Sequence, residues 1–105
     1  MTSGRKVEIA DHLVDASRLR ELCEHYGLVE LAVFGSRVRG DAQPESDVDL
    51  LYVLAPERRL GFSINRLEDE LAELFGHPVD LVSKKALHPR LRPRVLAEAR
   101  VLYAA

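Results

Sequence analysis

Few features of this sequence point to an oxidising compartment or to a membrane. The 105 residues include one cysteine, Cys23, so the chain cannot form an internal disulfide bond. No apolar run approaches the roughly 18 residues that a membrane-spanning helix needs, and the first residues contain no hydrophobic segment typical of a signal peptide. We therefore expect a cytoplasmic protein with no membrane contact.

A dominant charge is also missing. The chain has 15 basic and 17 acidic residues, which gives a formal net charge of −2. Because nucleic-acid-binding domains usually carry a clear excess of positive charge, this balance argues against a nucleic-acid partner.

Length and composition indicate one domain. A chain of 105 residues, 47% of them hydrophobic, can bury a core but has no room for a second one. We expect a single domain over residues 1–105, with residues 1–10 frayed because they offer little to bury.

Helical and extended patterns alternate along the chain. In order, they predict a helix over 11–26 stopped by Gly27, a strand over 29–34, an aspartate-bearing strand ending near residue 54, an amphipathic helix over 62–75 stopped by Gly76, a strand over 79–82, and a helix over 93–99 followed by a short apolar end. This order favours an α/β (α+β) fold in which helices pack on a small mixed β-sheet.

Two carboxylates one residue apart form the first candidate site. Asp47 and Asp49 are followed by apolar, β-prone residues, so this segment is predicted to be a strand. Alternate residues of a strand share a face, and two carboxylates held this close repel each other unless a cation lies between them. Magnesium prefers hard oxygen ligands, so the pair predicts a magnesium site.

An abrupt turn precedes that strand. The apolar run that ends at Phe34 is followed by Gly35 and Ser36, and a glycine there lets the backbone approach a ligand closely. A short helix beginning at Arg37 would add free N–H groups, which favour phosphate. Arg37 and Arg39 are candidates for neutralising phosphate charge. The turn is therefore predicted to bind the phosphates of a nucleotide.

These two features together resemble a family signature. The pattern is Gly35-Ser36, ten further residues and then Asp47-x-Asp49, as in the nucleotidyltransferase superfamily typified by DNA polymerase β. That family has a third carboxylate on a later strand, where this sequence has Asp80 among apolar residues. The short chain is similar to the smallest members, the minimal nucleotidyltransferases, which are often paired with HEPN-domain toxins.

The resemblance implies a nucleotidyltransferase fold and a reaction. Asp47, Asp49 and Asp80 would be catalytic and bind two magnesium ions, while Gly35 and Ser36 hold phosphate oxygens of ATP or another nucleoside triphosphate. Asp80 would also help to deprotonate the acceptor hydroxyl. The implied product is a nucleoside monophosphate, AMP first of all, on a protein hydroxyl. The first candidate acceptor is a tyrosine of a HEPN toxin, with this chain as its antitoxin.

Two other functions stay open. The chain could mask a partner without catalysis, or it could transfer the nucleoside monophosphate to RNA or to a small molecule. Because one domain leaves no separate acceptor-binding domain, a partner or an oligomer would have to bind the acceptor. The basic segment over residues 84–94 carries five cations and no acid. It is either a solvated, proline-broken connection or a contact for RNA, nucleotide or an acidic partner.

Overall fold

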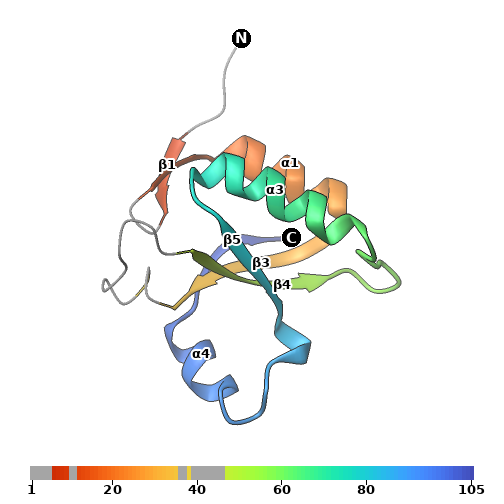
Figure 1. The fold of residues 1–105 in the computed structure, drawn as a ribbon, viewed down its shortest axis with the longest axis vertical. Helices are drawn as coiled ribbons and strands as arrows, with labels where there is room; N and C mark the ends of the chain where they lie inside the picture. The colour runs from red at the N-terminus through yellow and green to blue at the C-terminus, as the bar shows by residue number, and fades with distance from the viewer. Residues whose placement is uncertain (1–5, 10–11, 36–37, 39–46) are drawn as a thin grey trace.

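Figure 1 shows the fold in a computed structural model, which describes residues 6–9, 12–35, 38 and 47–105. The elements are β1 (Lys6–Ile9), β2 (His12–Asp15), α1 (Ala16–Tyr26), β3 (Leu28–Phe34), β4 (Val48–Leu54), α3 (Ser63–Phe75), β5 (Val79–Ser83), the 3-10 turn η1 (Lys84–Ala86), α4 (Arg92–Glu98) and β6 (Arg100–Ala104). β1 and β2 form a two-stranded sheet, and the other four strands form a sheet in the order β5-β4-β3-β6.

The four-stranded sheet is mixed. β3 runs antiparallel to both β4 and β6, whereas β4 and β5 are parallel. Parallel neighbours need a crossover connection, and α3 provides it between β4 and β5. The predicted fold class, a small mixed sheet packed with helices, is confirmed. None of the helices in the described part of the chain is long and apolar enough to cross a membrane.

Local signals set the ends of the two long helices. α1 begins after Asp15, whose carboxylate accepts hydrogen bonds from the backbone N–H groups of Ser17 at 3.0 Å and Arg18 at 3.2 Å. Both α1 and α3 end at a glycine in the left-handed conformation, Gly27 with φ 79° and Gly76 with φ 77°. The two predicted glycine stops are therefore confirmed.

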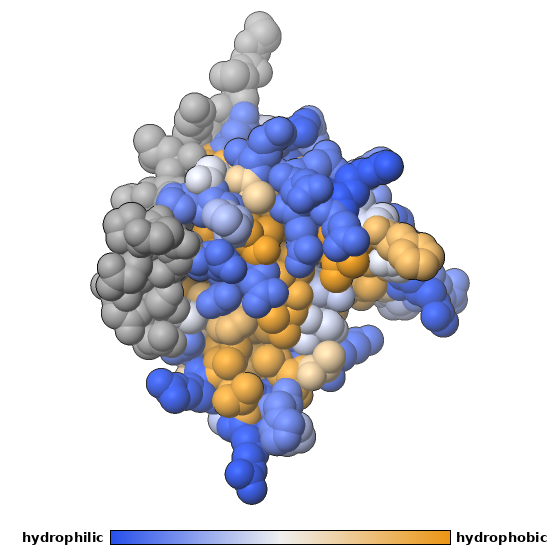
Figure 2. Space-filling view, viewed as in Figure 1, coloured by the Kyte–Doolittle hydropathy of each residue, from blue (hydrophilic) through white to orange (hydrophobic). Residues whose placement is uncertain are grey.

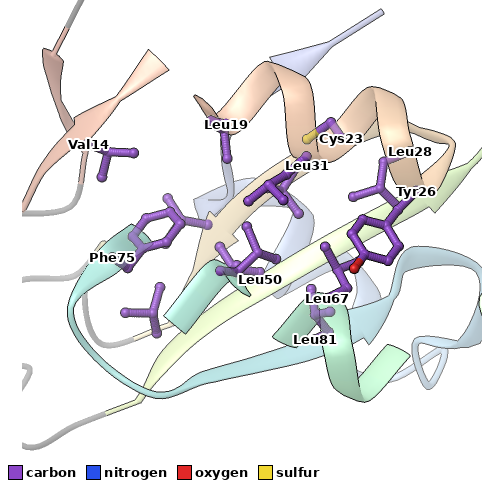
Figure 3. Packing of buried hydrophobic residues seen from close by; sticks show 14 of the residues in the cluster. Val14, Leu19, Cys23, Tyr26, Leu28, Leu31, Leu50, Leu67, Phe75 and Leu81 are labelled. Atoms are coloured by element: carbon purple, nitrogen blue, oxygen red, sulfur yellow. The ribbon is translucent and has the colours of Figure 1, made fainter. Parts of the chain in front are cut away.

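α1 and α3 cover one face of the four-stranded sheet, and α4 lies on the other side (Figure 1). Figure 3 shows the core between the two long helices and the sheet. It includes the buried side chains of Val14, Leu19, Leu22, Cys23, Tyr26, Leu28, Leu31, Val33, Val48, Leu50, Leu67, Leu71, Phe75 and Leu81. In β4, Val48 and Leu50 are both fully buried in this core. Because side chains alternate along a strand, Asp49 belongs to the opposite face, the side of α4.

A hydrogen bond joins the two long helices. The Tyr26 hydroxyl of α1 donates to the Glu70 carboxylate of α3, and the Arg18 guanidinium lies 3.9 Å from the same carboxylate. Burial first, and then the bond to Glu70, raise the pKa of Tyr26 above its ordinary value. A tyrosine hydroxyl is protonated at neutral pH in any case, and the raised pKa keeps it a donor into more alkaline solution.

The N-terminal predictions are wrong in two places. Lys6–Ile9 are not frayed, because they form β1 and pair with β2; residues 1–5 and 10 lie outside the described residues. The first long helix does not begin at residue 11. It begins at Ala16, because Asp15 caps it and the four preceding residues are paired in β2.

The single cysteine gives a first prediction. Burial, with a smaller contribution from Glu24, raises the pKa of the Cys23 thiol from 9.0 to about 12. Only the thiolate attacks a disulfide reagent, so at pH 8 the folded protein should react roughly a thousandfold more slowly than the unfolded chain. The reaction with Ellman's reagent, followed with and without denaturant, measures this ratio. Equal rates would contradict a buried thiol.

The same shift fixes the direction of a pH effect on stability. The pKa of the Cys23 thiol is higher in the folded than in the unfolded state. Its contribution to the free energy of unfolding is therefore fully present below pH 9.0 and is lost as the pH rises toward about 12. We therefore expect the free energy of unfolding of a Cys23→Ala variant to fall less over this pH range than that of the wild type. Denaturant titrations of both proteins at several pH values measure the difference.

Candidate active site

The glycine turn lies directly against an aspartate. Phe34, the last residue of β3, pairs with Asp49 of β4, and Gly35 follows with φ +85°, in the left-handed region. A Cβ atom added to Gly35 would lie 2.4 Å from the Oδ2 atom of Asp49, so one of the two would have to shift. Glycine adopts this positive φ without strain, and any other side chain here would force the Asp49 carboxylate to move.

The third predicted carboxylate is beside the second. In the parallel pair of β4 and β5, Asp80 is the register partner of Asp49. Neighbouring strands lie about 4.8 Å apart, so these two backbones are adjacent. Leu81 is part of the core, so by alternation Asp80 is assigned to the opposite face, as Asp49 is. Asp47 directly precedes β4 and is exposed.

The three carboxylates are near one another along the sheet but do not form a closed set of metal ligands. Among the residues that the structure describes, no three acidic, histidine or cysteine side chains lie close enough together to hold a metal ion. The donor chemistry still fits magnesium, which takes hard carboxylate oxygens and commonly completes its coordination with water and substrate phosphates. Asp49 and Asp80 are the pair that the strand register brings together.

A pocket of about 400 Å³ opens between this turn and α4. It is lined by Phe34, Gly35, Asp49, Leu91, Arg94, Val95 and Glu98. Its volume lies in the range of small-molecule sites in proteins, roughly 300–1,000 Å³. Figure 2 shows apolar side chains in the lower part of the molecule, the region of α4, where the side chains of Leu91 and Leu96 are 54% and 36% exposed.

Glu98 is the residue at this site that the sequence did not single out. Its Oε2 atom accepts a hydrogen bond from the backbone N–H of Gly35 at 3.0 Å. The two residues are 63 positions apart, so no local pattern links them. The one available signal was the spacing of residues 91, 94, 95 and 98, which lie on one face of a helix.

Part of the predicted site lies outside the described residues. This applies to Ser36, Arg37 and Arg39, to the short helix predicted to begin at Arg37, and to the loop before Asp47. Their assignment to phosphate binding stays a prediction.

The basic segment divides into parts with different roles. The Nζ atom of Lys84 lies 3.3 Å from the Glu30 carboxylate, and Arg92 donates from Nη1 to the Lys84 carbonyl oxygen at 2.9 Å. Lys84 thus joins η1 to β3 of the sheet, and Arg92 joins α4 to η1. Arg94 instead lines the pocket with Gly35. The segment is therefore more than a solvated connection.

Comparison with known proteins identifies the family. A model of the nucleotidyltransferase domain matches residues 17–103. The chain belongs to this nucleotidyltransferase family. A protein adenylyltransferase, MntA from Thermococcus cleftensis, is 42% identical over 79 residues, which cover 75% of this chain and 79% of that protein. A solved protein proposed to be a minimal nucleotidyltransferase is 42% identical, with a TM-score of 0.67 over 81% of this chain and 86% of its own.

Two solved complexes share the nucleotidyltransferase fold at lower identity. One is a toxin-antitoxin pair with AMP-PNP, at 21% identity and a TM-score of 0.68 over 88% of this chain and 75% of its own. The other is a tri-AMPylated HEPN toxin of Shewanella oneidensis with its MNT antitoxin, at 20% identity and a TM-score of 0.60 over 86% and 70% of the two chains. At these identities the likeness establishes the fold alone.

The close approach of Gly35 and Asp49 gives a second prediction. Gly35→Ala should cost about 1–2 kcal/mol for the left-handed backbone and a further 1–3 kcal/mol for crowding the Asp49 carboxylate. Gly76→Ala is the matched control, because Gly76 has φ +77° and open space at the Cβ position. Free energies of unfolding from urea titrations measure both.

A double-mutant cycle separates the two costs. In an Asp49→Ala background the Oδ2 atom is gone, so Gly35→Ala should cost no more than Gly76→Ala. If the cost of Gly35→Ala were the same with and without Asp49, the contact would not be responsible for it.

Proposed function

We propose that this chain is a magnesium-dependent nucleotidyltransferase that moves AMP from ATP to a hydroxyl of a partner protein. The observation that carries the proposal is the register of Asp49 and Asp80 beside the Gly35 turn, in a chain of the nucleotidyltransferase family. The acceptor is a tyrosine of a HEPN toxin, and the chain acts in the cytoplasm as the antitoxin of that toxin.

The chain's own residues have distinct tasks in this reaction. The turn binds the triphosphate through Ser36 and orients its α-phosphorus toward the acceptor, and Gly35 has no side chain to obstruct its approach. Asp80 accepts the proton of the acceptor hydroxyl, whose oxygen bonds to the α-phosphorus as the bond to the β-phosphate breaks and pyrophosphate leaves. Asp47, Asp49 and Asp80 are the residues that would hold magnesium. When bound, that ion neutralises the charge of the phosphates.

The protein acceptor and the adenylyl donor are supported by the relatives. MntA of Thermococcus cleftensis is a protein adenylyltransferase and matches three quarters of this chain. Two complexes that share the fold contain AMP-PNP in one case and a tri-AMPylated HEPN toxin in the other. A phosphate-binding turn beside paired carboxylates is consistent with that donor.

An isosteric substitution tests the proposal. The purified chain is incubated with magnesium, each nucleoside triphosphate in turn and the protein encoded by the adjoining reading frame, and the intact mass of that protein is measured. We expect an increase of one or more AMP units with ATP. Asp49→Asn should lower the rate by about a hundredfold or more, because the lost carboxylate supplies several kcal/mol of charge stabilisation.

Asp69→Asn is the matched control, because Asp69 is an exposed aspartate of α3 on the far side of the sheet. It should transfer at the wild-type rate. Transfer at the wild-type rate by Asp49→Asn would remove Asp49 from the mechanism. A stable complex without any mass increase would instead identify the chain as a masking partner.

A further inference from the structure

One face of α4 is turned toward the glycine turn. Leu91, which precedes the helix, and Arg94, Val95 and Glu98 are spaced as one helical face, and all four line the pocket shared with Gly35. None of them belongs to the glycine-serine or aspartate motifs. The pocket is therefore built from two parts of the chain, and only one of them carries the family signature.

The first contact across the pocket is the hydrogen bond from the Gly35 backbone N–H to the Glu98 carboxylate. Phe34 and Asp49 are the last paired position of β3 with β4, so the buried Gly35 lies just beyond the sheet hydrogen bonds. A buried N–H group needs an acceptor, and the Glu98 carboxylate accepts this one at 3.0 Å. The Asp49 carboxylate occupies the space into which a Cβ atom of the same glycine would project. The turn is thus held on one side by β4 and on another by α4.

The second feature is a cation at the same pocket. Arg94 is exposed and lines the pocket together with Asp49 and Glu98. Within residues 6–9, 12–35, 38 and 47–105, the ion pairs join Arg18 to Glu70 and Lys84 to Glu30, so neither uses Arg94. A guanidinium in this position can donate two parallel hydrogen bonds to a phosphate.

We propose that α4 contributes two residues to the donor site: Glu98 positions the Gly35 turn, and Arg94 binds the phosphates of the nucleoside triphosphate. This inference rests on the proposed function, since it concerns the same donor. While Glu98 accepts from the Gly35 amide, that amide is not available to a phosphate oxygen. The phosphates then need a donor other than this amide, and Arg94 is the one that the described part of the pocket offers.

A competing role for Glu98 predicts the opposite change in triphosphate affinity when this residue is removed. If the carboxylate occupied the place of a phosphate oxygen, its removal would free the amide and tighten triphosphate binding. If it positions the turn, its removal leaves the amide without an acceptor and weakens binding. Glutamine keeps an oxygen acceptor without the charge, so Glu98→Gln should retain most of a positioning role.

The experiment measures AMP-PNP affinity by calorimetry in the presence of magnesium, together with KM, kcat and thermal unfolding. We expect Glu98→Ala to weaken binding about tenfold and to lower kcat, and Glu98→Gln to stay within about threefold of the wild type. Arg94→Ala should weaken binding and raise KM about tenfold with little change in kcat. Glu73→Ala and Arg90→Ala, at exposed sites that do not line the pocket, should stay within about twofold.

The outcomes separate the two proposals. Tighter AMP-PNP binding by Glu98→Ala would overturn the positioning role, as would a lower melting temperature with unchanged affinity, KM and kcat. Wild-type affinity in Arg94→Ala would remove that residue from the site. A wild-type chain that binds AMP-PNP but transfers nothing would refute the proposed function, and the affinities of the variants would still decide the role of α4. A wild-type chain that binds no AMP-PNP would overturn both.

Discussion

The contact between Gly35 and Asp49 constrains everything else at the site. A Cβ atom on Gly35 would lie 2.4 Å from the Asp49 carboxylate, and Gly35 has φ +85°, so another residue here would strain the backbone and displace that carboxylate. β3 ends at this turn, with Phe34 as its last residue, and Asp49 is the residue of β4 opposite that end. The strand register and the tight approach of Gly35 together place the carboxylate next to the backbone that would meet the phosphates.

The same strand anchors the core and presents the site. Val48 and Leu50 are fully buried beneath α1 and α3, and Asp49 between them is assigned to the other face. Leu81 anchors β5 in the core in the same way, next to Asp80. Asp49 and Asp80 lie on strands that cannot slip by one residue, because a slip would expose their buried neighbours. Sites on such rigid elements keep their geometry better than sites on loops.

The sequence predicted the elements whose signals are local. The periodicity of α3, the glycine stops at Gly27 and Gly76, and the aspartate strand were each visible in a short window and are confirmed, except that the strand begins at Val48 and leaves out Asp47. The β1–β2 hairpin was missed because its pattern is weak and its strands have four residues each. Glu98 was missed for another reason. Its partner Gly35 lies 63 residues away, and only the sheet order brings β3 beside the strand that follows α4.

α4 depends on the site that it lines. A helix of seven residues has little stability of its own. Among the described residues, side-chain hydrogen bonds that hold it include those from Arg92 to the Lys84 carbonyl oxygen and from the Gly35 amide to Glu98. The second bond belongs to the turn, so the turn and the helix stabilise each other. By thermodynamic linkage, a ligand that fixes the turn also stabilises α4, and a change that loosens α4 lowers the affinity for that ligand.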